Sequence, residues 1–246
     1  FMFLSAINFT LHFLFIIKGS FNYFKNPEFK VYFSLIVMVS LIFFFNIYRL
    51  EILNNGDFMT IYEKLENSVF YAVSFLTTTG FSTINYLDWG NASLIIIFIL
   101  LFIGGCAGST TGGIKLVRTL LILKYLRSTI KKLIHPNGVY PIRIGKKEIS
   151  DDIVQGVLGF YLFYIIIFIM LSLIIALTAN TDFISSLAVS ASTIGNIGPG
   201  LGVIGPLHNW ANFPDSTKWI TSFCMLLGRL EIFTVLVLFS RTYWKR

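Results

Sequence analysis

Two short segments rich in glycine and hydroxyl side chains carry most of the chemistry that this sequence can perform. The first is Thr77-Thr78-Thr79-Gly80-Phe81-Ser82-Thr83, and the second is Gly195-Asn196-Ile197-Gly198-Pro199-Gly200. Each lies between two long apolar segments. Irregular backbone at membrane depth is tolerated only where it is buried in protein or lines a water-filled cavity. Carbonyl oxygens in such a loop can replace the hydration shell of a cation. We therefore interpret both segments as parts of an ion selectivity filter.

The predicted ion ligands are neutral oxygen atoms next to the central glycine of each loop. Gly80 and Gly198 can adopt positive φ without strain, which allows successive carbonyl groups to point toward one axis. Divalent-cation sites usually include carboxylates, and neither loop contains one, so the loops favour a monovalent ion. A glycine-rich kink that binds no ion is the alternative. The residues expected to coordinate the ion are Thr78, Thr79, Asn196 and Ile197.

Each loop follows a segment that is too short to cross a membrane. Residues 67–77 and 185–194 are each about ten residues long, whereas a spanning helix needs about 20. We expect both to be pore helices that dip into the membrane, because the carbonyl dipole at a helix C-terminus favours a nearby cation. The alternative is a re-entrant helix that only packs against its neighbours.

A third glycine-rich segment interrupts an apolar stretch. Residues 92–105 and 114–126 are each too short to span, and residues 104–113 join them. We interpret the whole as one helix broken at mid-membrane, whose linker acts as a gate below the filter. A packing face with small residues spaced by four is the alternative. The residues assigned to the gate are Gly104, Gly105, Gly108, Ser109, Gly112, Gly113 and Lys115.

Arg229 is predicted to lie near the middle of the last apolar helix, residues 219–240. An ionisable residue inside a membrane segment is a functional-site hypothesis by default, and a guanidinium group stays charged. If Arg229 faces the pore, it adds a barrier to cations and belongs to the gate. The alternative is a structural arginine bonded to carbonyl groups or to a carboxylate on another helix. Glu231 is not expected to be that partner, because residues two apart on a helix do not face each other.

The composition is that of an integral membrane protein. Of the 246 residues 55% are hydrophobic and only 13% are charged, against about a quarter charged in soluble domains. Basic residues gather at 18–30, 124–147 and 241–246, regions separated by an even number of crossings, so we place them on the cytoplasmic side. This topology accounts for the net charge of +7 without a nucleic-acid partner. The histidines are isolated and show no catalytic grouping, so we do not expect an enzyme.

The sequence also contains an internal repeat. Each unit has a long helix, a short dipping helix, a glycine loop, a tryptophan and a returning helix. Ala72-Val73-Ser74 and Ala188-Val189-Ser190 recur in the two dipping helices. We divide the chain into residues 1–29, 30–149 and 150–246. The first part contains an apolar run, residues 1–17, that we expect to be the last helix of a preceding repeat, followed by a cytoplasmic linker.

These motifs resemble the superfamily of Trk, Ktr and HKT potassium transporters, and most closely its TrkH-type translocating subunits. The resemblance implies an all-α integral membrane fold with four helix–pore-loop–helix repeats around a pseudo-fourfold pore. This chain then corresponds to the C-terminal half, with the third repeat at 30–149 and the fourth at 150–246. The motifs that carry it are the two filter loops, residues 104–113 with Lys115, Gly228-Arg229-Leu230-Glu231 and Asn26-Pro27-Glu28-Phe29.

The same resemblance implies a function and partners. It implies translocation of potassium ions across the bacterial inner membrane (the plasma membrane) by a multi-pass protein that forms a homodimer. It also implies a cytoplasmic ring of nucleotide-sensing regulatory subunits, and no cofactor besides the transported K⁺. Gly80 and Gly198 are the filter glycines it assigns, and Gly198 is chosen over Gly195 because it directly precedes the turn. The alternative function is a proton- or sodium-coupled cation transporter, which needs a titrating carboxylate at mid-membrane, for which Glu231 is the candidate.

Overall fold

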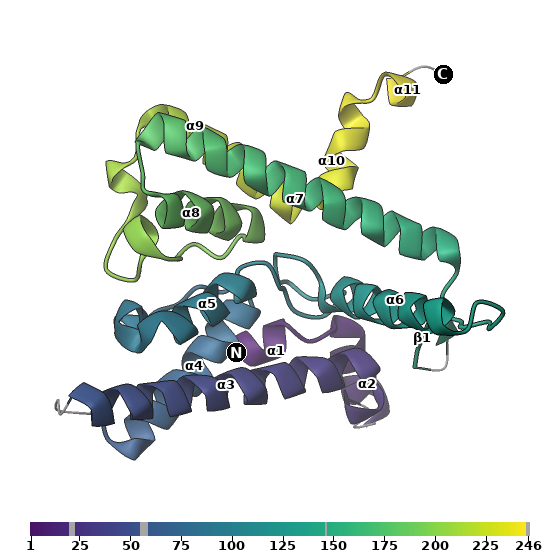
Figure 1. Ribbon diagram of the computed structural model, residues 1–246, viewed down its shortest axis with the longest axis horizontal. Coiled ribbons are helices and arrows are strands. Elements are labelled where there is room, and N and C mark those ends of the chain that lie inside the picture. The colour runs from purple at the N-terminus through teal and green to yellow at the C-terminus, as the bar shows by residue number, and fades with distance from the viewer. Residues whose placement is uncertain (20–22, 55–58, 146, 245–246) are drawn as a thin grey trace.

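The computed structural model describes residues 1–19, 23–54, 59–145 and 147–244 (Figure 1). Helices dominate the described chain, and the β1 and β2 strands form a small antiparallel hairpin. The helices are α1 (Met2–Ser5), α2 (Phe9–Lys18), α3 (Pro27–Asn54), α4 (Ile61–Leu76), α5 (Gly90–Leu100), α6 (Leu116–Ile134), α7 (Asp151–Ala179), α8 (Phe183–Gly195), α9 (Asp215–Arg229), α10 (Ile232–Phe239) and α11 (Arg241–Trp244). Short 3₁₀ helices are η1 (Tyr23–Lys25), η2 (Tyr86–Trp89), η3 (Gly202–Ile204) and η4 (Trp210–Asn212), and the strands are β1 (Arg143–Ile144) and β2 (Lys147–Glu148).

Two units of the same design lie one above the other in Figure 1. In the first, the long helix α3 is followed by the short helix α4, a loop, Trp89 in η2, and the returning helices α5 and α6. In the second, α7 is followed by α8, a loop, Trp210 in η4, and the returning helices α9 and α10. The structure therefore confirms the predicted helix–pore-loop–helix repeat. In both units the returning helix consists of two pieces.

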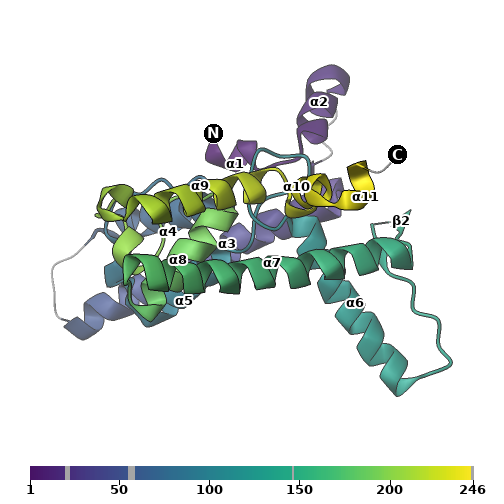
Figure 2. The ribbon, with the colours of Figure 1, turned by 90° about the horizontal axis from the view of Figure 1, so that it is seen from above.

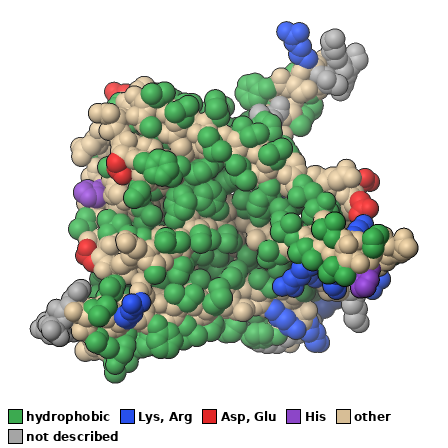
Figure 3. All heavy atoms as spheres, viewed as in Figure 1, with side chains coloured by type: hydrophobic (Ala, Val, Ile, Leu, Met, Phe, Trp, Pro, Cys, Tyr) green, Lys and Arg blue, Asp and Glu red, His purple; other side chains and the backbone are tan. Residues whose placement is uncertain are grey.

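The longest helices, α3 and α7, have the length and the apolar composition of membrane spans. Their most apolar windows have mean hydropathies of 2.2 and 2.8, and 28% of each window is buried inside the protein. The remainder faces outward, as Figure 3 shows for a face that is largely hydrophobic. Helices α9 and α10 form a third candidate span that is bent by 106°. The described chain is thus a multi-pass membrane structure.

The last apolar run is not one helix, contrary to the prediction for residues 219–240. Helix α9 ends at Arg229, and α10 begins at Ile232 after the sharp bend. Between them Glu231 has a φ of 58°, a left-handed conformation that interrupts a right-handed helix. Arg229 therefore lies at a helix end and not at a helix centre. The continuous apolar pattern conceals this break, because hydropathy does not report backbone conformation.

The expected single helix over residues 1–17 is also divided. Asn8 caps α2 by accepting a hydrogen bond from the backbone N–H of Thr10 at 2.8 Å. At the junction between α1 and α2, the carbonyl of Ala6 accepts from the N–H of Cys106 at 2.9 Å, and the N–H of Phe9 donates to the carbonyl of Gly108 at 3.0 Å. The junction leaves the helical conformation and binds the glycine-rich segment between α5 and α6.

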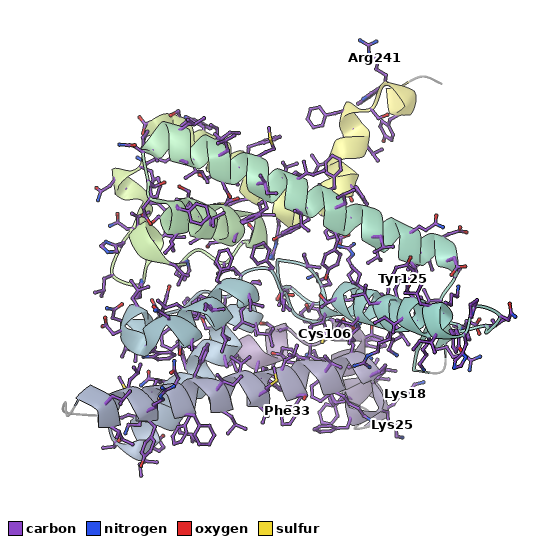
Figure 4. All side chains as sticks on the ribbon, in the orientation of Figure 1. Lys18, Lys25, Phe33, Cys106, Tyr125 and Arg241 are labelled. Atoms are coloured by element: carbon purple, nitrogen blue, oxygen red, sulfur yellow. The ribbon has the colours of Figure 1, made fainter. Side chains whose placement is uncertain are left out.

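The basic regions lie at one end of the molecule, as the charge pattern predicts. Figure 4 labels Lys18, Lys25 and Arg241 at the end where α6 terminates, and lysine and arginine side chains gather over that part of α6 in Figure 3. Figure 2 shows α6 extending away from α7 at this end. The opposite end contains the last turn of α3 and the first turns of α8 and α9.

Buried aromatic side chains support the first filter loop. Tyr71 makes edge-on contacts with Trp89 and Tyr86, with ring centroids 4.9 and 5.3 Å apart. The Tyr71 hydroxyl accepts hydrogen bonds from the N–H groups of Thr83 and Ile84, both at 2.8 Å, and donates to the Ile84 carbonyl at 2.6 Å. One side chain of the dipping helix α4 therefore fixes the outgoing strand of its own loop.

A buried ion pair joins the end of α3 to the start of α4. The Lys64 ammonium contacts the Glu51 carboxylate, and their side chains are only 8% and 17% exposed. The Lys64 nitrogen also lies 5.2 Å from the centre of the Tyr48 ring. This pair links the last turns of α3 to the first turn of α4.

We expect Lys64→Met to lower the free energy of unfolding by about 3–5 kcal/mol, because it leaves a buried carboxylate without its partner. The double variant Lys64→Met/Glu51→Leu should recover most of that loss. Thermal unfolding in detergent measures both. The control is Lys218→Met, which breaks the exposed pair with Asp215 and should cost at most about 1 kcal/mol. Equal losses for Lys64→Met and Lys218→Met would contradict this role of the buried pair.

Candidate ion-conducting site: two filter loops and an intramembrane loop

The two predicted filter loops have the same backbone conformation at equivalent positions. Thr78 and Asn196 both adopt positive φ, at 51° and 55°, within two residues of the end of their dipping helices. Two residues later, Gly80 and Gly198 adopt φ values of 73° and 104°. The structural equivalent of Gly80 is therefore Gly198, as predicted. Gly195 belongs to the last turn of α8.

A serine hydroxyl shapes each loop in the same way. Ser74 Oγ donates to the carbonyl of Phe81 at 2.7 Å, and Ser192 Oγ donates to the carbonyl of Pro199 at 2.9 Å. The carbonyls of the same two serines accept hydrogen bonds at 3.0 Å from the N–H groups of Thr79 and Ile197. Each dipping helix thus clamps both strands of the loop that follows it.

This equivalence corrects the repeat as it is read from the sequence. The tripeptides ending at Ser74 and at Ser190 match in sequence, but the structural counterpart of Ser74 is Ser192. Ser190 Oγ instead donates to the carbonyl of Phe168 on α7 at 2.8 Å. Small side chains recur on both dipping helices because these helices are closely packed. The matching tripeptides therefore do not occupy equivalent positions relative to the loops that follow them.

The two loops lie against each other. A Cβ atom on Gly80 would overlap the carbonyl oxygen of Ile197 and lie 2.6 Å from Cδ of Pro199. Tyr86, from the first unit, donates a hydrogen bond of 2.5 Å to the carbonyl of Gly200 in the second. Gly80 is therefore required for its φ and for the close approach of the second loop.

The polar side chains of the predicted ligands contact other protein groups, whereas their backbone carbonyl groups accept no hydrogen bond from the described residues. Thr78 Oγ1 accepts from the N–H of Gly112 at 2.7 Å, Thr79 Oγ1 lies 2.7 Å from Thr77 Oγ1, and Asn196 Nδ2 donates to Met225 at 3.0 Å. Within the described residues, no hydrogen bond reaches the four carbonyl oxygens. The groups left available to an ion are the carbonyls of Thr78, Thr79, Asn196 and Ile197.

The segment between α5 and α6 is an ordered, non-helical loop. The N–H of Gly104 donates to the carbonyl of Ile114 at 2.8 Å, and the N–H of Ile114 donates to Phe102 at 3.0 Å, which closes the loop at its base. The Lys115 ammonium folds back onto the carbonyl and the hydroxyl of Thr111. The predicted break is confirmed, and the glycines do not form a packing face on a helix. We call residues 104–113 the intramembrane loop.

This loop touches both filter loops. The hydrogen bond from Gly112 to Thr78 joins it to the first, and a Cβ atom on Gly112 would overlap the carbonyl oxygen of Gly195 beside the second. Thr78 lies two residues after α4 and Gly195 is the last residue of α8, so the contact is where the dipping helices end, which we call the inner mouth of the loops. Two further glycines predicted for the gate, Gly105 and Gly108, lie against Ala6 and Asn8.

A cavity of about 290 Å³ joins the intramembrane loop to the break in the last helix. Arg118 of α6 also lines it, and its guanidinium lies 2.6 Å from the Glu231 carboxylate at the break and 4.1 Å from the centre of the Phe160 ring on α7. Arg229 lines the same cavity, and no hydrogen bond or ion pair of its side chain occurs among the described residues. The loop residues in this lining are those from Gly108 to Gly113, followed by Lys115.

Three positive side chains, Lys115, Arg118 and Arg229, therefore border one cavity next to the inner mouth of the predicted filter loops. Arg118 is paired with Glu231, whereas Lys115 and Arg229 have no carboxylate partner among the described residues. Like charges at such a place raise the electrostatic potential that a cation meets. Among the described residues Arg229 forms neither of the bonds of its structural alternative, to a carbonyl group or to a carboxylate of another helix, and the nearby Glu231 is paired with Arg118. Sequence reasoning missed Arg118 because only the break in the last helix brings Glu231 to it.

A family model described as TrkH, a cation transport protein, matches residues 1–246. The chain belongs to this family. The TrkH family match also agrees with the predicted all-α membrane fold, since the structure superposes on the crystal structure of the potassium transporter TrkH from Vibrio parahaemolyticus with a TM-score of 0.90. That comparison covers 99% of this chain and 51% of the other, at 34% sequence identity.

Curated relatives give the same result. The chain is 36% identical over 248 residues to the Trk system potassium uptake protein TrkH of Vibrio parahaemolyticus, and 38% identical over 251 residues to TrkH of Escherichia coli K12. Both comparisons cover all of this chain, and 50% and 49% of the relatives. The chain thus spans about half the length of the curated relatives that it matches.

We expect Gly80→Ala to be far more damaging than Gly198→Ala. A Cβ at Gly80 collides with the second loop, whereas nothing lies within 4 Å of a Cβ at Gly198, where only the φ of 104° opposes it. Thermal unfolding and ⁸⁶Rb⁺ uptake into proteoliposomes should both show the difference. Equal tolerance of the two substitutions would contradict the close packing of the loops.

Proposed function

We propose that this chain forms part of a pore that conducts potassium ions across a membrane. The observation that carries the proposal is the pair of equivalent loops, whose carbonyl groups at the predicted ligand positions accept no hydrogen bond in the described structure. A dehydrated monovalent cation is stabilised by such neutral oxygen atoms. The relatives named as potassium uptake proteins support potassium as the transported ion.

The filter is assigned to six residues, three from each unit. Thr78, Thr79 and Gly80 come from the first loop, and their equivalents from the second are Asn196, Ile197 and Gly198. Because Thr78 and Asn196 use their side chains to bind neighbouring segments, we propose that they contact the ion through backbone oxygen alone. Since the chain spans about half the length of its relatives, we propose that two further loops of the same kind complete the pore.

The gate is assigned to the intramembrane loop together with Lys115 and Arg229. The loop closes the inner mouth through its contacts with Thr78 and Gly195, and the two cations oppose entry into the adjacent cavity. Conduction then requires the loop to move away from the filter. We propose that two copies assemble and that a cytoplasmic nucleotide-sensing ring moves the loop from the basic side of the molecule.

A coupled cation transporter is less well supported. It needs a carboxylate that exchanges protons near mid-membrane, and Glu231 was its candidate. Glu231 instead forms an ion pair with Arg118 at the break between α9 and α10. Conduction through a pore is therefore better supported than coupled transport.

The direct test of conduction is uptake of ⁸⁶Rb⁺ into proteoliposomes that contain the full-length protein. We expect excess potassium to block uptake and equal sodium to leave it unchanged, because the ligands are uncharged and fixed. Equal block by both ions would retain the pore and reject potassium selectivity. Absence of uptake, in the wild type and in a variant without residues 108–112, would contradict the proposal.

We expect Arg229→Ala to raise the rate of ⁸⁶Rb⁺ uptake several-fold, because it removes one positive charge from the cavity below the filter. The matched control is Arg127→Ala on the exposed part of α6, which should leave the rate unchanged. A folded Arg229→Ala protein with the wild-type rate would show that Arg229 is not an electrostatic barrier.

A further inference from the structure

A buried carboxylate at the start of α3 contacts the intramembrane loop. Asn26 caps this helix, since its Oδ1 accepts from the N–H groups of Glu28 at 2.8 Å and Phe29 at 3.3 Å. Glu28 follows Pro27 in the first turn and is only 7% exposed. Its carboxylate points away from α3 and toward the connection between α5 and α6.

Glu28 Oε1 accepts two backbone hydrogen bonds from that connection. One comes from the N–H of Ala107 at 2.7 Å, and the other comes from the N–H of Val117 at 3.1 Å. Ala107 lies within the intramembrane loop, and Val117 lies in the first turn of α6. One carboxylate oxygen therefore ties together the two ends of the segment that contains Ser109, Gly112 and Lys115.

The start of α6 explains why an acceptor is needed there. The first N–H groups of a helix have no partner within the helix. The N-cap position of α6 is Lys115, whose side chain contains no acceptor. Glu28 supplies the missing acceptor from another helix, and its negative charge is favoured at a helix N-terminus. Hydrogen bonds to a charged acceptor are stronger than those to a neutral one.

We propose that Glu28 is a positioning residue that holds the intramembrane loop against the filter. The chain of contacts runs from Glu28 to Ala107 and Val117, through the loop, to the hydrogen bond between Gly112 and Thr78. The proposal rests on the proposed function of the loop as a gate. Release of Glu28 leaves the N–H groups of Ala107 and Val117 without this acceptor, which removes one contact near each end of the loop, while the backbone bonds of the loop to Ala6 and Phe9 remain.

The second unit offers a matched control. Its long helix α7 begins with Asp151 and Asp152, so it also has a carboxylate in the first turn. Both aspartates are exposed, and neither hydrogen-bonds to another segment among the described residues. Substitution of Asp152 removes a comparable charge from a comparable helix start without touching the loop.

Cys106 is a built-in reporter of loop position. It directly precedes Ala107 within the intramembrane loop, is 1% exposed, and is labelled in Figure 4. We would measure its reaction rate with a membrane-impermeant maleimide, added from the cytoplasmic side, in protein in which Cys106 is the only cysteine. Glu28→Ala should raise the rate about tenfold or more over wild type and Asp152→Ala, since a charge-assisted bond is lost. Glu28→Gln, which keeps a neutral acceptor, should give an intermediate rate.

Equal labelling rates in Glu28→Ala and Asp152→Ala would overturn the proposal. If Glu28→Ala does not fold, the labelling rate of Glu28→Gln is compared with that of Asp152→Asn, because both variants retain the side-chain volume. A Cys106 labelling rate in Glu28→Gln equal to that in Asp152→Asn then overturns the proposal. The labelling does not depend on ion flux, so it tests Glu28 even if the pore itself is refuted.

Ion flux provides the second measurement. In ⁸⁶Rb⁺ uptake, Glu28→Ala should raise the basal rate while potassium still blocks and sodium does not, because the filter loops are unchanged. A faster rate with lost selectivity would show that Glu28 supports the filter itself and would overturn a role confined to the loop.

Discussion

A backbone that leaves the helical conformation at membrane depth must find partners for its N–H and C=O groups within the protein. The structure satisfies this constraint at the two filter loops by using side chains of the dipping helices as internal partners. Ser74 and Ser192 bind the outgoing strands, and Tyr71 binds the first loop further on. What remains unpaired is a small set of carbonyl groups around Gly80 and Gly198. A transported cation can supply the partner that these groups lack.

The same constraint connects the filter to the gate. The intramembrane loop is also irregular backbone. Its N–H and C=O groups form hydrogen bonds with Thr78, with the junction between α1 and α2, and with Glu28. Movement of the loop breaks hydrogen bonds at the inner mouth of the filter. In the proposed mechanism, closure and filter geometry are therefore coupled through shared hydrogen-bond partners and not only through proximity.

The parts that depend on local sequence were predictable. Glycine after a short helix rich in serine and threonine predicted the irregular backbone of both loops, whose filter role stays a prediction. Glycine density predicted the break between α5 and α6. The break after Arg229 was missed, because it depends on a left-handed Glu231 whose carboxylate is held by Arg118, distant in sequence. Glu28 was noticed only as part of a motif, since its partners lie 79 and 89 residues away.

The central claim is that the carbonyl groups of the two loops bind one ion together. Anomalous diffraction from crystals of the full-length protein grown with Rb⁺ tests this most directly. The account predicts an anomalous peak in direct contact with the carbonyl oxygens of Thr79 and Ile197, which is lost when potassium replaces rubidium. Rubidium bound elsewhere in the membrane region, with these carbonyls free of any ion, would contradict it.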